Sequence, residues 1–265
     1  MGLIDTHTHL ESFERRGETA AVLERARAAD VEALITVGTS LDDWALYRRL
    51  AEQHAGYVHY TAGLHPCAVE EDWEAQLDAL PAFWRDGRVP VALGEIGLDR
   101  FHLPKDADEA EVVLRRQKAA FARGLDVATS LGCPVVVHSR GAFAECVEMI
   151  DASGVDWAKV VFHCFVEGPA EMSELVGRGG WGSFTGVLTY KSAETVREAA
   201  RTQGLERFLV ETDAPYLTPV PHRGKPNEVA YVRHTAEFAA SEVFGVSSAE
   251  LAAVSTRNAK AFFKL

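Results

Sequence analysis

The sequence predicts an α/β protein built as a single (β/α)8 barrel, a TIM barrel, over residues 1–265. Eight short apolar runs rich in β-branched residues alternate with longer charged segments of helical period. Most of these runs lack polar alternation, which is typical of strands buried on both faces. Eight strand–helix units in 265 residues match the usual size of such a barrel, and no linker or low-complexity segment divides the chain.

A doubly wound open sheet shares this alternation, but the count of eight and the lack of a break favour the closed barrel. The expected strands are Leu3–His7, Ala33–Gly38, Val58–Leu64, Val89–Ile96, Pro134–His138, Val160–Phe165, Trp181–Leu188 and Arg207–Glu211. The expected helices include Thr19–Asp30, Leu41–His54, Trp73–Trp84, Glu109–Leu131, Ala193–Thr202, Glu228–Phe244 and Ser248–Phe263. Ser247 or Ser248 suits the N-cap of the last helix.

The composition excludes several classes of protein. The chain is 47% hydrophobic and 25% charged, as is ordinary for a globular protein, and no apolar run approaches the roughly 20 residues of a membrane span. Its four cysteines form no CxxC pair, so the spacing indicates neither a thiol zinc site nor a disulfide framework, and we expect a cytoplasmic protein. A net charge of −12 argues against coating of duplex DNA, although residues 201–265 carry 8 basic and 7 acidic side chains.

The first strand carries a pattern that can bind metal. Asp5, His7 and His9 are each two residues apart, so we expect them to share one strand face and to point into the barrel mouth. His-x-His on a strand is a chelating pair for a divalent metal. On its own, the pattern more often reflects two hydrogen-bonded histidines than a metal site.

Four other strands also end in metal-binding side chains. Glu95, His138, His163 and Asp213 end the fourth, fifth, sixth and eighth runs. Taken singly, Glu95 suits an ion pair, and His138 and His163 suit hydrogen-bonded core histidines. Asp213 suits an N-cap or a turn residue. In a TIM barrel, however, all these strand ends surround one pocket.

These positions supply six nitrogen or oxygen donors, too many for one tetrahedral zinc. We expect two divalent ions (Zn, Mg or Mn) bridged by Glu95. One ion takes His7, His9 and Asp213, and the other takes His138 and His163.

Other residues near the strand ends are candidates for substrate contact and proton transfer. Asp213 and Glu95 are catalytic candidates, with Asp213 as general base. His65, after the third strand, suits either a phosphate or leaving-group contact or a loop cap. Arg140 suits either a phosphate contact or a salt bridge. Arg223, Lys225 and Asn227 follow the eighth strand, near where barrels often bind phosphate, but also suit a solvated loop.

The chain resembles the TatD family of metal-dependent deoxyribonucleases along essentially its whole length. The resemblance runs through Asp5–Leu10, Gly63–Pro66, Gly94–Asp99, His138–Arg140, His163–Phe165 and Glu211–Pro215. It implies a TIM-barrel hydrolase with two divalent metals that cleaves DNA phosphodiesters, often from a 3′ end. Two segments depart from the usual family pattern. Asn227–Val229 lacks the common proline, and Arg100–Pro104 lacks the tyrosine-rich form.

Two other functions are alternatives to a nuclease. A small-molecule amidohydrolase, such as a lactonase or phosphotriesterase-like enzyme, often bridges its metals with a carboxylated lysine, whereas this chain has Glu95 and no lysine in the fourth or fifth strand. A non-catalytic, metal-stabilised module would have an eroded ligand set, but all six positions are intact. We therefore expect DNA, single-stranded or at 3′ ends, as the substrate, with no membrane association and no obligate protein partner.

Overall fold

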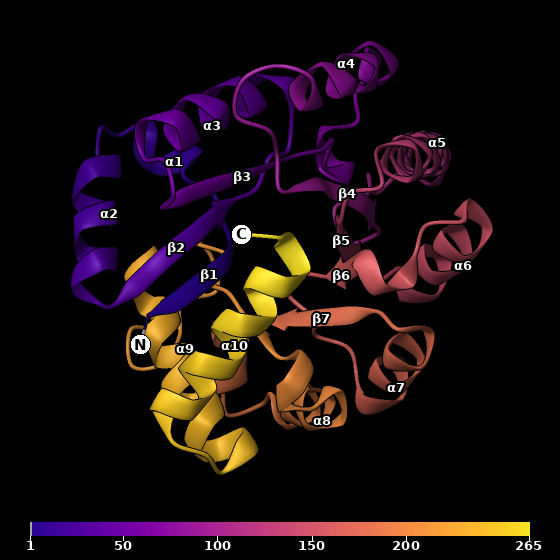
Figure 1. Cartoon of the computed structure of the whole chain (residues 1–265). Helices are drawn as coiled ribbons and strands as arrows, with labels where there is room; N and C mark the ends of the chain where they lie inside the picture. Colours follow the sequence, from indigo (N-terminus) through magenta and orange to yellow (C-terminus); the bar gives the residue numbers. More distant parts are fainter. Residues whose placement is uncertain (1) are drawn as a thin grey trace.

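The computed structural model describes residues 2–265, and eight parallel strands form one sheet in the order of the sequence (Figure 1). The strands are β1 (Leu3–Thr8), β2 (Val31–Thr36), β3 (Val58–Ala62), β4 (Ala92–Asp99), β5 (Val135–Arg140), β6 (Val160–Phe162), β7 (Trp181–Phe184) and β8 (Leu209–Val210). The sheet curves round until Thr8 and Ala214 form a parallel bridge. The predicted (β/α)8 barrel is therefore confirmed.

Helices lie outside the strands, and their bounds mostly follow the predicted ranges (Figure 1). They are α1 (Glu11–Glu14), α2 (Thr19–Ala28), α3 (Leu41–Gln53), α4 (Trp73–Ala79), α5 (Ala107–Leu131), α6 (Phe143–Ser153), α7 (Pro169–Arg178), α8 (Glu194–Gln203), α9 (Val232–Phe238) and α10 (Ser248–Phe263). Ser247 caps α10 by accepting a hydrogen bond from the Glu250 amide at 3.1 Å, as predicted. The helix predicted over Glu228–Phe244 is interrupted, because α9 lies between a 3₁₀ turn and a π-helical turn.

Alternate strand residues fill the barrel with an apolar cluster. Its members are Ile4, Ala33, Ile35, Val37, Ala92, Val136, Val161 and Leu209 from the strand segments, with Ala259, Phe262 and Phe263 from α10. The strand residues of opposite orientation pack outward against the helices, in a second and larger core. The end of α10 therefore closes the amino end of the barrel, and the carboxyl end is left for polar side chains.

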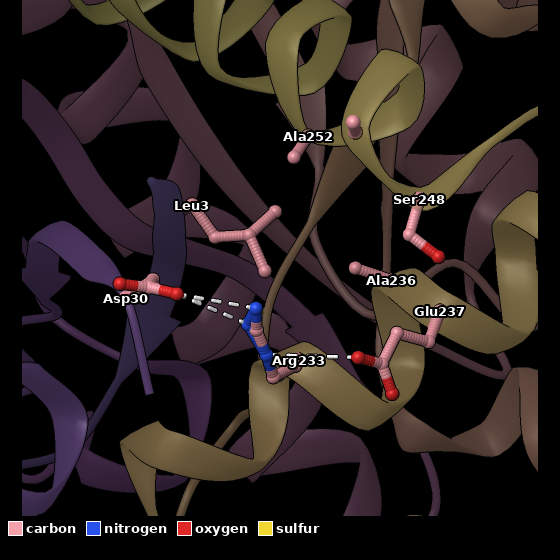
Figure 2. A pocket seen from close by; sticks show the side chains of 8 residues that line it. Leu3, Asp30, Arg233, Ala236, Glu237, Ser248 and Ala252 are labelled. Atoms are coloured by element: carbon pink, nitrogen blue, oxygen red, sulfur yellow. Dashed lines mark hydrogen bonds and ion pairs between the residues drawn. The ribbon is translucent and has the colours of Figure 1, made fainter. Parts of the chain in front are cut away.

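A small cavity of about 160 Å³ lies near this amino end, between β1, α9 and α10 (Figure 2). The Arg233 guanidinium in its wall pairs with Asp30 at 3.2 Å and with Glu237 at 3.6 Å. Leu3 and Ala252 give the cavity an apolar side. Its polar groups are thus paired with one another rather than directed at a common point.

Among residues 2–265, we find no helix with the length and apolar character needed to cross a membrane.

Candidate metal centre and active site

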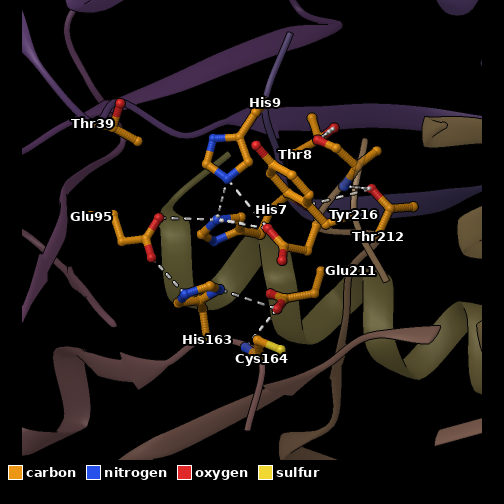
Figure 3. Close-up of polar contacts among 12 residues, drawn as sticks. His7, Thr8, His9, Thr39, Glu95, His163, Cys164, Glu211, Thr212 and Tyr216 are labelled. Carbon is orange, nitrogen blue, oxygen red and sulfur yellow. Dashed lines mark hydrogen bonds and ion pairs between the residues drawn. The ribbon is translucent and has the colours of Figure 1, made fainter. Parts of the chain in front are cut away.

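The carboxyl ends of the strands bring the six predicted ligand residues together at the mouth of the barrel. Figure 3 shows four of them, His7, His9, Glu95 and His163, pointing toward one another. We call the six residues the mouth cluster. They are His7 in β1, His9 just after it, Glu95 in β4, His138 in β5, His163 just after β6 and Asp213 after β8. All except the half-buried His9, His138 and Asp213 are buried.

Glu95 lies at the centre of the mouth cluster, and its two carboxylate oxygens face different histidines. Oε1 is 2.7 Å from His138 Nδ1 and 2.6 Å from His163 Nε2. Oε2 is 3.4 Å from His7 Nε2. A carboxylate that turns one oxygen to each of two groups of nitrogen atoms has the arrangement needed to bridge two cations.

The His-x-His pair and Asp213 form the second half of the mouth cluster. The Nε2 atoms of His7 and His9 are 3.3 Å apart. Asp213 Oδ1 lies 3.3 Å from His9 Nε2 and 3.7 Å from His7 Nε2. These side chains converge on one another from strands at the two ends of the chain.

Asp5 does not join this cluster, contrary to the prediction from strand alternation. Its carboxylate accepts hydrogen bonds from the Thr212 amide at 2.9 Å, the Thr212 hydroxyl at 2.6 Å and the His7 amide at 3.3 Å. The register between β1 and β2 shifts between Asp5 and Thr8, so the strict two-residue alternation is broken there. Asp5 therefore ties β1 to the end of β8 rather than facing the mouth.

Two buried carboxylates outside the predicted set orient histidines of the mouth cluster. Asp99 Oδ2 is 3.1 Å from His138 Nε2, the nitrogen that faces away from Glu95. Glu211 Oε1 lies 3.6 Å from His163 Nδ1 and also accepts a hydrogen bond from the Cys164 amide at 2.7 Å. Carboxylates that hold the far nitrogen of a ligating histidine fix its orientation and raise its basicity. A carboxylate in an apolar strand is costly unless it is paired, and this cost is the sequence signal that could have identified Glu211.

His65 contributes a neutral imidazole with a defined tautomer. Its Nδ1 accepts a hydrogen bond from the Cys67 amide at 3.0 Å, so Nε2 carries the proton of the neutral ring. Burial lowers the pKa of His65 to about 3. Nε2 points into the cluster, 3.5 Å from Glu95 Oε1 and 3.2 Å from His138 Nδ1. His65 is therefore placed as a hydrogen-bond donor.

A close contact between two strands brings His65 near Glu95. Gly63 and Gly94 pack backbone to backbone, and a Cβ atom on Gly63 would lie 2.6 Å from the Gly94 Cα. Any side chain at position 63 would therefore separate the ends of β3 and β4.

The charges in the mouth cluster depend on one another. Burial alone would raise the pKa of Glu95, but His163, His65 and His7 hold it well below its ordinary value. Burial alone would lower the pKa of His163, but Glu95 and Glu211 raise it well above its ordinary value. Burial likewise opposes ionisation of Asp213, whose pKa is nevertheless lowered by His9 and His7. The carboxylates are thus ionised and favour positive charge at the centre of the cluster.

The backbone is in the left-handed region at two positions in this mouth. Cys164 has φ 45° and Asp213 has φ 54°, although neither is glycine. The turn at Cys164 directs its amide to Glu211, and the Asp213 amide donates to the His7 carbonyl at 2.9 Å. Strained backbone of this kind concentrates at functional sites, where surrounding contacts hold it in place.

The basic residues that were predicted to contact substrate lie exposed around the mouth, at the end of β5 and on the loop after β8. Arg140 is exposed and stacks over the Phe101 ring, with Cζ 4.2 Å from the ring centroid. Arg223 is also exposed and stacks over Tyr190 at 3.7 Å, while Lys225 is exposed on the same loop.

The position of Asn227 does not match the predicted substrate contact. The residue is buried, and its amide nitrogen donates to the carbonyls of Thr212 at 2.8 Å and Tyr216 at 2.6 Å, so both of its N–H groups are used within the loop. The structure therefore assigns Asn227 to shaping this loop rather than to binding substrate.

The donor atoms suit divalent cations. Three groups of side chains offer ligand atoms within 4.8 Å of one another: His7, His9 and Glu95; His65, Glu95 and His138; and His7, His163 and Glu211. Imidazole nitrogen and carboxylate oxygen are the ligands that zinc and related divalent metals accept in hydrolytic sites. Nitrogen atoms that face one another around a buried carboxylate are better satisfied by a cation than by each other.

A TIM barrel with buried histidines and carboxylates converging at its mouth belongs to the class of metal-dependent hydrolases. The TatD related DNase family profile matches residues 4–264 of this chain. The chain belongs to that family.

Relatives and solved structures agree with this placement. The chain is 36% identical over its full length to the uncharacterized metal-dependent hydrolase YcfH of Escherichia coli K12, of which it covers 97%. It is 30% identical to the 3′-5′ ssDNA/RNA exonuclease TatD of Erwinia amylovora, over 99% of this chain and 100% of the relative. The structure of the TatD homologue YJJV of Escherichia coli K12 matches with a TM-score of 0.86 at 27% identity, over 99% of this chain and 98% of that one.

Proposed function

We propose that this metal-dependent hydrolase is a deoxyribonuclease that removes nucleotides from 3′ ends of single-stranded DNA. The central observation is Glu95, whose two oxygens face separate groups of histidines at 2.6–3.4 Å. In this proposal His7, His9 and Asp213 would hold one divalent ion, His138 and His163 would hold a second, and Glu95 would contribute to both. When bound, such ions supply Lewis acidity that lowers the pKa of water and neutralises charge on a phosphodiester.

The rim of the mouth supports a nucleic-acid substrate. Phe101 follows β4 and is 69% exposed, while Tyr216 follows β8 and is 62% exposed. Strands four places apart in an eight-stranded barrel lie on opposite sides of the mouth. Exposed aromatic rings can stack on bases, at about 1–3 kcal/mol per base, and the Arg140 guanidinium over Phe101 adds positive charge. The relative from Erwinia amylovora is named as a 3′-5′ exonuclease of single-stranded DNA and RNA.

In the proposed reaction, three residues of this chain accept the proton or bind the phosphate. Asp213 Oδ1 is the acceptor for the proton of the attacking water, because the carboxylate is ionised and borders both His7 and His9. His65 Nε2 donates a hydrogen bond to a phosphate oxygen, since its other nitrogen is occupied by the Cys67 amide. Arg140 binds the phosphate of the neighbouring nucleotide at the rim.

The direct test is cleavage of single-stranded DNA labelled at the 3′ end, with wild type and Glu95→Ala each supplied with Mg²⁺, Mn²⁺ or Zn²⁺. We expect metal-dependent release of labelled nucleotides by the wild type and none by Glu95→Ala. Glu145→Gln is the matched control, because Glu145 pairs with Arg100 and Lys118 away from the cluster. No cleavage by the wild type contradicts the nuclease proposal, and retained cleavage by Glu95→Ala contradicts the role of Glu95.

The same proteins should be assayed with p-nitrophenyl phosphodiesters and with lactones. The proposal predicts turnover of the phosphodiesters. Preferential turnover of lactones would instead identify a small-molecule hydrolase that uses the same cluster.

A further inference from the structure

A second group of metal-binding side chains lies at the rim, outside the mouth cluster. Cys67 belongs to the turn after β3, Asp99 ends β4 and His102 lies in the following loop. We propose that these three residues, the rim triad, form a separate binding site for a thiophilic divalent cation such as Zn²⁺. This inference does not depend on DNA being the substrate.

The distances within the rim triad suit metal coordination. Cys67 Sγ lies 3.6 Å from Asp99 Oδ2, and tetrahedral zinc separates a sulfur and an oxygen ligand by about 3.5 Å. His102 Nδ1 lies 2.8 Å from the same oxygen, and one ligand atom from each residue lies within 4.8 Å of the others. A small movement of His102 Nδ1 away from Asp99 Oδ2 would complete three corners of a tetrahedron, with water at the fourth.

Burial and access also favour a site here. The Asp99 carboxylate is fully buried at the base of the triad, where the Asp99 Oδ1 atom accepts a hydrogen bond from the His102 amide at 2.8 Å. Cys67 is exposed and the His102 side chain is 53% exposed, so an ion reaches the triad from solvent. One buried carboxylate with two exposed ligands above it allows binding without rearrangement of the barrel.

The charges balance when a cation binds. Burial and the neighbouring Asp99 raise the pKa of the Cys67 thiol to about 12, so the thiol keeps its proton while no cation is present. On binding, the thiol proton leaves to solvent and the sulfur lone pair goes to the ion. The His102 proton moves from Nδ1 to Nε2, which frees the Nδ1 lone pair. One thiolate, one carboxylate, a neutral imidazole and a divalent cation then sum to zero charge.

The Asp99 carboxylate connects the rim triad to the mouth cluster. Asp99 Oδ2 also accepts from His138 Nε2 at 3.1 Å, so a rim cation and His138 would share the same carboxylate oxygen. Binding at the rim therefore withdraws charge from the His138 contact, and we expect it to slow hydrolysis.

Cobalt substitution tests the proposal without an activity assay. A thiolate bound to Co²⁺ gives an intense near-ultraviolet charge-transfer band, whereas the mouth cluster offers only nitrogen and oxygen donors. We expect this band when the wild-type protein is titrated with Co²⁺. Cys67→Ser should lack the band and should bind one equivalent of metal less than the wild type. His102→Ala should weaken Zn²⁺ binding at this site by about 10-fold or more.

Cys133→Ser is the control, because Cys133 is a half-buried thiol elsewhere and should leave the band unchanged. Circular dichroism establishes that each variant is folded. The absence of the band from the wild type contradicts the proposal. Its persistence in Cys67→Ser does so as well, since another cysteine would then be the ligand.

Discussion

The two ends of the barrel contain the same residue type in opposite electrostatic settings. His59 in β3 lies towards the amino end, where burial and the Arg88 guanidinium lower its pKa to about 4. His163 lies at the carboxyl end, where burial also opposes its charge, but Glu95 and Glu211 raise its pKa well above the ordinary value. Burial alone does not decide whether a histidine is charged, because neighbouring carboxylates reverse the effect.

The two ends of the barrel therefore have different roles. The amino end stabilises the fold, and the carboxyl end forms the candidate site. The amino end is filled by apolar strand residues and by Phe262 and Phe263 of α10. The carboxyl end gathers charged groups whose mutual distances, rather than apolar packing, define the site. Substitutions at the mouth should therefore reduce activity more than stability, and substitutions at the amino end should do the reverse.

The largest effect is expected for Asp213→Asn at the mouth. The amide cannot accept the proton of the attacking water, so kcat should fall by on the order of 10³-fold. Thermal unfolding of this variant should stay close to that of the wild type, because no apolar contact is lost. A rate within a few-fold of the wild type would exclude Asp213 as general base.

Phe262→Ala tests the opposite end. The buried ring lies 5.4 Å from Trp181 and 4.8 Å from Phe263, and its removal should cost about 3–4 kcal/mol of unfolding free energy in denaturant titrations. The kcat/KM of the folded fraction should be unchanged. A large loss of activity per folded molecule would show that the two ends are coupled.

Asp99→Asn should have an intermediate effect at the mouth. The neutral amide oxygen of the variant would be a weaker acceptor for His138, so metal affinity or activity should fall by about 10–100-fold. Asp78→Asn is a suitable control, since Asp78 forms a surface ion pair with Arg123. Equal effects of both substitutions would contradict an orienting role for Asp99.

The smallest effect concerns the pH dependence of stability at the amino end. The folded pKa of His59 is about 4 against an ordinary value of 6.5, so the unfolded chain binds the extra proton between these values. The stabilising contribution of neutral His59 is present above pH 6.5 and is lost as pH falls towards 4. Because the ring is incompletely buried, we expect a loss of about 1 kcal/mol.

His59→Gln should make the free energy of unfolding less dependent on pH over that range. Identical pH profiles for the wild type and this variant would contradict the assigned pKa.

The sequence was sufficient for the barrel and for the grouping of the six mouth residues, because both follow from strand period and the geometry of a parallel barrel. Local backbone detail was not predictable in this way. The seventh strand was expected to reach Leu188 but ends at Phe184, since the Thr185 hydroxyl accepts from the Val187 amide and starts a 3₁₀ turn. The shift in β1 displaced Asp5 for a similar reason, because alternation assumes an undistorted strand.

Individual contacts between side chains from different strands were also beyond sequence reasoning. Asp99 meets His138, and Glu211 meets His163, only after the barrel has formed. The rim triad illustrates the same limit, because the expectation of no thiol metal site was based on CxxC spacing within one segment. Cys67 and His102 approach each other from separate loops.

The seam between the first and last strands has a consequence for the timing of synthesis. During synthesis His7 and His9 are made well before Asp213 and the β8 segment that closes the ring. The α10 residues that fill the barrel floor follow later still. A growing chain therefore carries five of the six mouth residues before Asp213 is made, and the mouth cluster is complete only when the segment after β8 closes the ring.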